Sequence, residues 1–583
     1  MSEEQTGHED FEMDALNRVR AYHHRTKHGF GRYAASPGFM DWETQPDPFR
    51  RFDGAQQFPL PLAADSLAVL YADLFTPEGI SASPLDKTGV GILLELSFGL
   101  AAWKQYGNDR WALRCNPSSG NLHPTEAYLI ASGVPGLEDG GYHYASIDHA
   151  LEQRCQFEPP FHGLLVGLSS IHWREAWKYG ERAFRYCQHD IGHGLGALRY
   201  AAAVLGWRLR LLDSWGDGDI AALLGLDRQA DFAGAEIEAP DVLCLIETGV
   251  DGDGEPDIDA LLNAASAGIW TGKANTLSQV HHSNWPVIDE VCAAAHKPRT
   301  INPTPLGNAV DTHLRPHPNP PPPRESFLGG RTISINSTPL PALSPTLCEL
   351  TAAELIKQRR SAQAFDGVTA IPAKTLCRIL DATLPRTNMP PLDLWNRSPK
   401  VHLVLFIHRV VGLPPGVYLF CRSAEAEPVL KAKLKESFKW ESCDGIPNHL
   451  RLYRLLRADA RQAATTLSCQ QAIAGDSAFS LGMLTEFEAG LAEGPWGYRR
   501  LFWECGLIGQ ALYLEAEAAG VRGTGIGCFF DDPVHELLGL DETAFQSLYH
   551  FTVGGPVVDN RLENLPGYWH LERLQSSQHQ RAT

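Results

Sequence analysis

The stretch Leu223-Leu224-Gly225-Leu226-Asp227 recurs as Leu537-Leu538-Gly539-Leu540-Asp541, 314 positions further along the chain. Three other pairs keep nearly the same spacing: Gly192 with Gly506, Gly206 with Gly520, and Phe52-Asp53-Gly54 with Phe365-Asp366-Gly367. A chance match would not hold its spacing over so long a stretch, so the pattern predicts two copies of one fold. The second copy is expected to begin near residue 345.

The length and composition are those of a globular protein with two large cores. A chain of 583 residues exceeds the roughly 250–300 residues at which a single core stops growing. Its 44% hydrophobic and 20% charged residues are typical of globular domains. The formal net charge of −19 argues against nucleic acid as a partner, because phosphate backbones are bound by basic surfaces.

Nothing in the sequence resembles a targeting or membrane-spanning segment. The N-terminal residues are polar and acidic, unlike a signal peptide. The longest aliphatic run, Val401 to Ile407, is far too short to cross a bilayer. We therefore expect a cytoplasmic protein that does not bind membranes. The twelve cysteines are scattered singly, without zinc-site spacing, so no metal is expected and they carry no recognisable chemistry.

Helical periodicity with a few short strand signals predicts an α+β layer fold in each copy. The expected helices are 192–205, 352–358 and 507–519, and the expected strands are 127–130, 242–246, 401–407 and 551–553. The predicted organisation is an N-terminal arm (1–45), a first domain (46–250), a linker that is proline-rich near its end (251–344), a second domain (345–570) and a polar tail (571–583). The proline-rich part is interpreted as a semi-rigid spacer, with a recognition motif for a proline-binding partner as the alternative.

Three motifs could form a binding site, and each occurs in one copy only. The first, Arg359-Arg360-Ser361, can present two guanidinium groups and a hydroxyl to a phosphate. The matching positions of the first copy are Pro46-Asp47-Pro48, which cannot. Taken alone, the arginine pair could equally be a solvated basic patch.

The second motif is the polar turn Asn116 to Pro124, whose short side chains suit the polar edge of a flat heterocycle. The third is Gly523 to Phe529, where glycines allow backbone N–H groups to approach a ligand closely. A plain turn and a structural loop are the alternatives. Gly192 to Ala197 fits a dinucleotide-binding pattern, but no buried strand precedes it, so we interpret it as a helix-packing segment.

Together these residues resemble the flavin-dependent nitroreductase superfamily, and within it the SagB/ThcOx-type dehydrogenases, over residues 20–250 and 345–570. The resemblance implies two tandem nitroreductase-like domains that form an intramolecular pseudo-dimer with FMN between them. In such dimers one subunit supplies a phosphate grip, a glycine loop and a basic residue, and its partner supplies a P-S-x-x-N turn. The corresponding cofactor-binding residues are Arg359, Arg360, Ser361, Gly525, Ile526, Gly527 and Arg561 in the second copy, and Pro117, Ser118, Ser119 and Asn121 in the first.

Lys178-Tyr179-Gly180-Glu181-Arg182 is similar to the K-Y-G-x-R motif of that subfamily. The resemblance implies that Lys178 and Tyr179 are catalytic and handle protons while a hydride passes to the flavin. An ordinary surface helix is the alternative.

The function implied by the resemblance is FMN-dependent oxidation of an azoline-like heterocycle in a modified peptide, with electrons returned to oxygen. An NAD(P)H-dependent nitro or quinone reductase, and a flavin-free scaffold in a biosynthetic assembly, are the alternatives. The expected partners are the small-molecule or modified-peptide substrate and, as a candidate, a cyclodehydratase. The fused unit is expected to be monomeric or weakly oligomeric.

Overall fold

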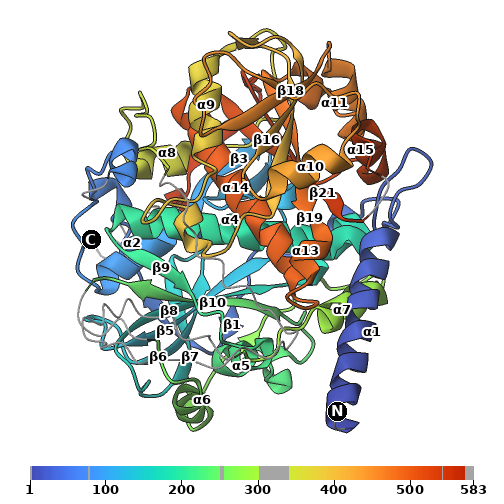
Figure 1. Ribbon diagram of the computed structural model, residues 1–583. Helices are drawn as coiled ribbons and strands as arrows, with labels where there is room; N and C mark the ends of the chain where they lie inside the picture. The colour runs from blue at the N-terminus through green and yellow to red at the C-terminus, as the bar shows by residue number, and fades with distance from the viewer. Residues whose placement is uncertain (1–2, 77–78, 250–254, 301–339, 541–542, 572–583) are drawn as a thin grey trace, which may run out of the picture.

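The structure is a computed structural model that describes residues 3–76, 79–249, 255–300, 340–540 and 543–571. Its centre is a pair of long helices, α4 (Ala183–Val204) and α14 (Gly497–Ala518), with one antiparallel sheet on either side of the pair (Figure 1). Every residue of α4 is buried. The two helices therefore form the shared core between the two halves of the chain.

The first sheet has the strand order β11-β7-β6-β5-β8-β10-β9, and all of its pairings are antiparallel. Its strands are β5 (Thr125–Ser132), β6 (Gly140–Ala145), β7 (Ala150–Gln156), β8 (Gly163–Ser170), β9 (Arg208–Leu211), β10 (Ala239–Glu247) and β11 (Ile269–Trp270), with β2 (Gln56–Pro59) paired on β7. The helices of this half are α2 (Lys87–Ser97), α3 (His172–Tyr179), α4 and α5 (Asp217–Leu224). The strands expected at 127–130 and 242–246 are confirmed.

The second sheet has the order β17-β18-β16-β14-β19-β21-β20 and is also antiparallel. Its strands are β14 (Val401–Ile407), β16 (Gly416–Cys421), β17 (Glu441–Ser442), β18 (Arg451–Arg457), β19 (Phe479–Glu486), β20 (Arg522–Ile526) and β21 (Phe545–Gly554). The helices are α8 (Ala352–Gln358), α9 (Ala373–Asp381), α10 (Ala426–Lys433), α11 (Arg461–Leu467), α12 (Ala472–Asp476), α13 (Phe487–Leu491), α14 and α15 (Asp531–Leu538). The strands expected at 401–407 and 551–553 and the helix expected at 352–358 are confirmed.

The two halves repeat their central elements at the spacing read from the sequence. Helices α4 and α14 begin and end 314 positions apart, and so do α5 and α15. The glycines of the repeated Leu-Leu-Gly-Leu-Asp stretch explain its recurrence. Gly225 and Gly539 end α5 and α15 with φ of 71° and 77°, a left-handed conformation that side-chain-bearing residues adopt at a cost.

Helices α4 and α14 approach each other at two glycines. A Cβ on Gly192 would lie 2.4 Å from the carbonyl oxygen of Trp503 and 2.8 Å from Cα of Gly506. A Cβ on Gly196 would lie 2.8 Å from Cβ of Gln510. The interpretation of this segment as helix packing is confirmed, because small residues let the two backbones come into contact.

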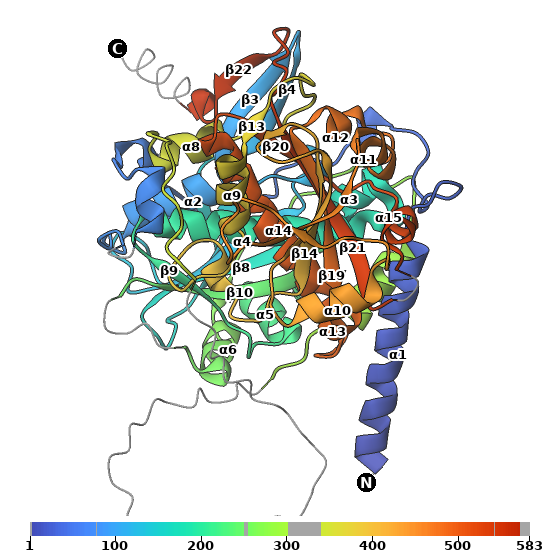
Figure 2. The same cartoon turned by 45° about the horizontal axis from the view of Figure 1, so that its top comes forward.

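The two ends of the chain cross over to the opposite half. Helix α1 (Glu3–Arg25) belongs to the expected N-terminal arm, yet His23 lies against Tyr498 and Gln546 of the second half. At the other end, β22 (Glu563–Pro566) pairs with β3 (Leu100–Tyr106), which in turn pairs with β4 (Asp109–Arg114) (Figure 2). The halves are thus held by exchanged segments as well as by the central helices.

Part of the expected linker is folded structure. Residues 255–300 contain α6 (Ile258–Ser266), β11, β12 (Lys273–Ala274) and α7 (Pro286–Ala294), and β12 pairs with β1 (Phe52–Asp53). The expected linker thus contains folded structure as far as residue 300, because Leu261 of α6 packs in the core beside the first sheet and Val291 of α7 packs in the cluster that includes α1 and the second half. A short parallel pair, β13 (Ile371–Pro372) with β15 (Val410–Val411), completes the second half. The proline-rich stretch and nearly all of the expected polar tail lie outside the described residues.

None of the helices in the described ranges combines the length and the apolar character needed to cross a membrane.

The contact between α4 and α14 predicts the effect of adding one methyl group. Gly192→Ala should lower the free energy of unfolding by roughly 2–3 kcal/mol, because the new Cβ meets backbone atoms that cannot move aside. Gly218→Ala is the matched control, since Gly218 lies on helix α5 with no atom within 4 Å of its added Cβ and should gain up to about 1 kcal/mol. Chemical denaturation measures both changes. Equal midpoints for the two variants would contradict the close contact of the helices.

Candidate functional site

The polar turn of the first half is held by a carboxylate from the central helix. Ser119 donates to Oδ1 of Asp190 on α4 through its backbone N–H at 3.3 Å and its Oγ at 3.5 Å. Asn121 donates from Nδ2 to the Ala112 carbonyl at 2.9 Å and contacts His123 Nε2 through Oδ1 at 3.0 Å. Pro117 is buried, whereas Ser118 and Ser119 are partly exposed. The turn is therefore rigid, with part of its polar surface available.

Lys178 and Tyr179 converge on this turn from the end of α3. A Cβ placed on Gly120 would lie 2.6 Å from the Tyr179 hydroxyl and 3.1 Å from Nζ of Lys178. Nζ of Lys178 is 5.3 Å from the Tyr179 ring centroid. Burial, followed by the nearby Glu175, raises the pKa of Tyr179 well above its usual range, so its phenol stays protonated. Gly120 thus provides the space that these two side chains occupy beside the turn.

Arg359 brings the second half to the same region. Its Nη2 donates to the backbone carbonyl of Arg114 at 3.3 Å, two residues before the turn of the other half begins. Its carbon Cζ lies 5.0 Å from the ring centroid of Tyr513. Both Nε and Nη1 are buried without a hydrogen-bond partner. Buried, unpaired guanidinium donors are costly, so this arginine is suited to an anionic partner.

Further cations gather around Arg359. Lys104 has a lowered pKa, because it is partly buried and lies near Arg360 and Arg522. Burial, followed by repulsion from Arg359, lowers the pKa of Arg360 to about 10. Two carboxylates, Glu517 and Asp559, lie nearby and offset part of this charge. The cationic cluster, defined as Lys104, Arg359, Arg360 and Arg522, combines side chains from both halves.

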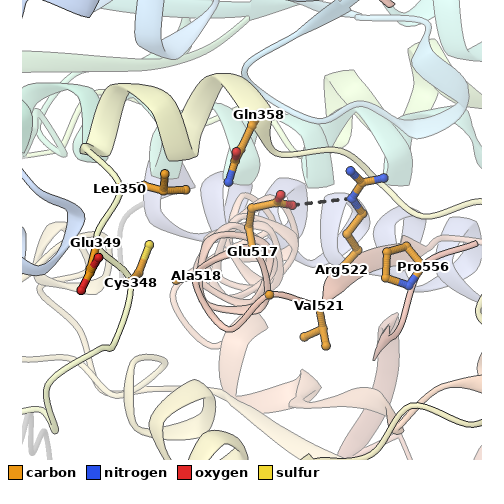
Figure 3. A pocket seen from close by; sticks show the side chains of 10 residues that line it. Cys348, Glu349, Leu350, Gln358, Glu517, Ala518, Val521, Arg522 and Pro556 are labelled. Carbon is orange, nitrogen blue, oxygen red and sulfur yellow. Dashed lines mark ion pairs between the residues drawn. The ribbon is translucent and has the colours of Figure 1, made fainter. Parts of the chain in front are cut away.

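A pocket of about 380 Å³ borders the cationic cluster (Figure 3). Glu517 and Arg522 lie on its wall, with Arg522 Nε 3.9 Å from Oε2 of Glu517. Gln358, which precedes Arg359, and Pro556 also line it. This pocket gives solvent access to the outer side of the cluster.

The remaining members of the predicted phosphate grip are placed differently. Arg360 donates to the backbone carbonyls of Lys357 and Arg359 at 2.6 and 2.7 Å, so part of its donor capacity is already used. Ser361 is exposed, and its Oγ lies 2.9 Å from the Tyr513 hydroxyl. Arg561 has a 75% exposed side chain paired with Asp559 at 2.8 Å. Arg359 is thus the only buried arginine of this predicted set.

The first part of the glycine motif is an edge strand, whereas Gly527 to Phe529 lie in the loop that follows it. Gly523 to Ile526 belong to β20 and pair with β21. A Cβ on Gly525 would fall 1.9 Å from the Tyr549 hydroxyl, and one on Gly527 would fall 2.0 Å from the Tyr186 ring. The Gly525 N–H donates to the Tyr513 hydroxyl at 2.9 Å. Aromatic side chains therefore pack directly on the backbone where larger residues would have projected, whereas Ile526 is buried in a separate hydrophobic cluster with Leu484 and Val534.

A buried carboxyl pair, Glu175 and Asp190, was missed from the sequence. Both Glu175 oxygens and Oδ2 of Asp190 are buried without partners. Burial raises the pKa of Asp190 to about 7, and burial together with the Asp190 charge raises that of Glu175 well above its usual range. The pair therefore holds a proton near neutral pH, next to Lys178 and the turn. The sequence carried no signal for this pair, because an acidic residue in a helix usually faces solvent.

On the other side of the molecule, ion pairs occupy the positions that match Gly527, Tyr186 and Arg360. Asp213, which is 314 positions before Gly527, pairs with Arg397 at 2.8 Å and with Arg500 at 3.0 Å. Arg500 itself is 314 positions after Tyr186. Asp47, at the position of Arg360, pairs with its neighbour Arg51. The polar turn, the cationic cluster and the glycine strand therefore occur together on one side only among the described residues.

The described residues contain no group of three or more histidine, cysteine, aspartate or glutamate side chains arranged to hold a metal ion.

Comparisons with known proteins agree with this architecture. Residues 451–555 match the family model described as the Nitroreductase family, a stretch that includes β20 but neither Arg359 nor the polar turn. A curated protein of Methanocaldococcus jannaschii named as a nitroreductase is 27% identical over 147 residues, which are 23% of this chain and 73% of that protein.

A solved structure from Anabaena variabilis, described as a nitroreductase, shares the fold of both halves. It superposes with a TM-score of 0.62 at 22% identity, over 93% of this chain and 99% of its own. A nitroreductase-like structure from Exiguobacterium sibiricum in complex with FMN is 14% identical over 36% of this chain and 91% of its own. Its TM-score of 0.23 is too low to indicate a shared overall fold. The family match thus covers part of the second half, and the Anabaena variabilis structure shows the same fold over nearly the whole chain.

The carboxyl pair predicts a pH dependence of stability. Because burial raises the pKa of Asp190, the folded state keeps a proton that the unfolded chain releases above about pH 4, and stability falls until about pH 7. Asp190→Asn, which keeps the acceptor for Ser119, should remove roughly 2–4 kcal/mol of that loss between pH 5 and pH 8. Denaturation at the two pH values measures it. Asp53→Asn, on an exposed carboxylate, should change nothing, and equal pH slopes for wild type and Asp190→Asn would refute the shift.

Proposed function

We propose that the chain is an FMN-dependent oxidoreductase in which two fused nitroreductase-like halves act as an intramolecular pseudo-dimer with one flavin site. The observation that carries the proposal is Arg359, which has two buried N–H groups without a partner and contacts Arg114 of the opposite half. The anion it requires would thus lie where the two halves meet. The single site is supported by the ion pairs that fill the matching positions around Asp213.

The residues present fit the phosphate end of FMN. A phosphate dianion would satisfy the orphaned Nε and Nη1 of Arg359, and Lys104, Arg360 and Arg522 supply further positive charge nearby. Glu517 and Asp559 would reduce the attraction between the cationic cluster and the phosphate without cancelling it. Arg561 would add to this grip only after leaving its ion pair with Asp559.

The ring end would be formed by the glycine strand and the polar turn. Gly525 and Gly527 present backbone without side chains, and Ser118, Ser119 and Asn121 come from the other half. Tyr513 lies between the predicted phosphate-binding residues and the glycine strand, because its hydroxyl contacts both Ser361 Oγ and the Gly525 N–H. We infer that flavin binding requires this hydroxyl to give up the Gly525 N–H.

Bound FMN would supply the hydride acceptor of the reaction. Side chains of the protein would accept the proton that leaves the substrate together with the hydride. Lys178 lies at the turn beside the neutral phenol of Tyr179, and the carboxyl pair Glu175 and Asp190 lies behind them. Lys178 is the candidate base, and the pair can take up a proton at neutral pH. Tyr179 would orient the substrate through its hydroxyl.

We further propose an azoline-like heterocycle in a modified peptide as the substrate. Its oxidation removes a hydride and a proton together, which suits a base placed beside the flavin site. A nicotinamide-driven nitro or quinone reduction needs no such base on the protein, so the Lys178 and Tyr179 arrangement favours the dehydrogenase.

Flavin binding tests the cofactor and the role of Arg359. Titration of the full chain with FMN should give a bound-flavin absorbance spectrum, and Arg359→Ala should weaken binding by about 1.5–3 kcal/mol, or roughly 10- to 150-fold. Asp47→Ala, at the matching position of Arg360 in the first half, should leave affinity within threefold. A protein that binds no FMN, or equal losses in both variants, would contradict the proposal.

Substrate turnover separates the two reactions. The holoenzyme should oxidise an azoline-containing peptide under air without added nicotinamide, and Lys178→Met should lower kcat by about 10²- to 10⁴-fold while FMN stays bound. NAD(P)H oxidation with a nitroaromatic acceptor is the competing assay. Fast nicotinamide turnover that Lys178→Met leaves unchanged would favour the reductase.

A further inference from the structure

Two cysteines that are far apart in the sequence meet just beyond the glycine strand. Cys528 follows Gly527, and Cys469 follows helix α11. Their thiols lie within hydrogen-bonding reach of each other, and both residues are partly exposed. The two segments are fixed to one another, because the Phe530 N–H donates to the Leu467 carbonyl at 2.8 Å and Gln471 Nε2 donates to the Cys528 carbonyl at 3.1 Å.

The backbone at Cys469 is strained. Cys469 and Gln470 have φ of 53° and 62°, a left-handed conformation that non-glycine residues adopt at a cost of about 1 kcal/mol or more each. Two consecutive residues in this conformation turn the chain sharply after α11. Strain of this kind persists where it positions a functional group, and here it lies at the residue whose thiol meets Cys528.

His28 completes the arrangement from the N-terminal arm. Its Nδ1 accepts a hydrogen bond from the Ala34 N–H at 2.9 Å, so the ring proton of the neutral imidazole lies on Nε2. The side chain also has a hydrogen-bonding interaction with Cys528. The backbone of His28 is clamped to Asp531 by two hydrogen bonds of 2.9 Å. His28 is therefore a fixed donor to the sulfur.

The surroundings favour a thiolate at Cys528. Hydrogen bonds from Cys469 and His28, followed by the charge of Arg182, lower its pKa to about 5, while the pKa of Cys469 is raised by that same hydrogen bond. Burial lowers the pKa of His28, which keeps it neutral. The other charged or titratable groups that face the pair are Asp531, Tyr33, Tyr179 and Tyr186. Cys528 is thus the nucleophile and Cys469 the resolving thiol.

We propose that Cys528 and Cys469 form a peroxide-reactive redox pair. Cys528 sulfur attacks one oxygen of hydrogen peroxide, the O–O bond breaks, and one water leaves with a sulfenic acid formed on Cys528. Cys469 sulfur then attacks the sulfenic sulfur, the S–O bond breaks, and a second water leaves as the disulfide forms. Two thiols lose two electrons and two protons, and one peroxide becomes two waters.

The position of the pair gives its oxidation a structural consequence. Cys528 is bonded to Gly527, whose carbonyl accepts from Arg182 at 3.2 Å. A disulfide would tie this end of the glycine strand covalently to the loop after α11. The pair does not depend on flavin, because its electrons go to the peroxide.

Mass spectrometry of the full chain tests the pair. One equivalent of hydrogen peroxide should remove about 2 Da and give a Cys469–Cys528 cross-linked peptide on mapping. Cys469→Ser should instead accumulate a sulfenic acid on Cys528 that dimedone traps, and Cys528→Ser should form neither product. Cys443→Ser is the matched control on another partly exposed cysteine and should behave as wild type.

Alkylation rates give a second measurement that does not depend on disulfide formation. At pH 6, iodoacetamide should label Cys528 roughly five- to tenfold faster than Cys443, since only a thiolate reacts at that pH. His28→Ala should reduce this advantage without altering the labelling of Cys443, because the hydrogen bond from Cys469 remains. Cross-links distributed over other cysteines, or equal labelling rates at Cys528 and Cys443, would overturn the proposal.

Discussion

The backbone contact between α4 and α14 is the constraint on which the rest of the structure depends. Gly192 and Gly506 allow the two helices to touch, and each helix then carries side chains that position one half of the site. Asp190 on α4 holds the polar turn, whereas Tyr513 on α14 contacts Ser361 and the glycine strand. A wider separation of α4 and α14 would move the polar turn away from the glycine strand. The geometry of the candidate site therefore depends on the close packing of the two helices.

The repeat in the sequence predicted the central elements well, because their bounds are fixed by local chemistry. Gly225 and Gly539 end matching helices in the left-handed conformation, and apolar periodicity marks the helices before them. The crossing of α1 and β22 to the opposite halves could not be predicted, since hydrophobic patterning shows that a face is buried but not against what. The glycine strand was read as a loop because its neighbours, Tyr549 and Tyr186, fill the missing side-chain space from distant positions.

Residues of the candidate site could be selected from the sequence where one half differs from the other. Arg359 stood out because the matching positions of the first half, Pro46-Asp47-Pro48, include no basic residue, and the structure buries it against the opposite half. Arg561 matched a motif equally well, yet a carboxylate two residues away pairs with it. Glu175 and Asp190 carry no local signature, because an acid in a helix usually faces solvent. Cys469 and Cys528 meet only in three dimensions, which no spacing rule reveals.

The side of the molecule that contains the ion pairs of Asp213 explains how the two halves can differ in sequence and still remain associated. Asp213, Arg397 and Arg500 occupy positions that match parts of the open side, and their ion pairs join the halves where no ligand is required. Partly exposed pairs of this kind contribute little to stability, on the order of 1 kcal/mol or less each. They instead specify which faces meet, because any other register would leave like charges or unpaired carboxylates at the interface. These ion pairs fix the register on the side of the molecule that contains Asp213. Arg359, on the opposite side, can therefore remain unpaired, and this asymmetry suits a single anionic ligand.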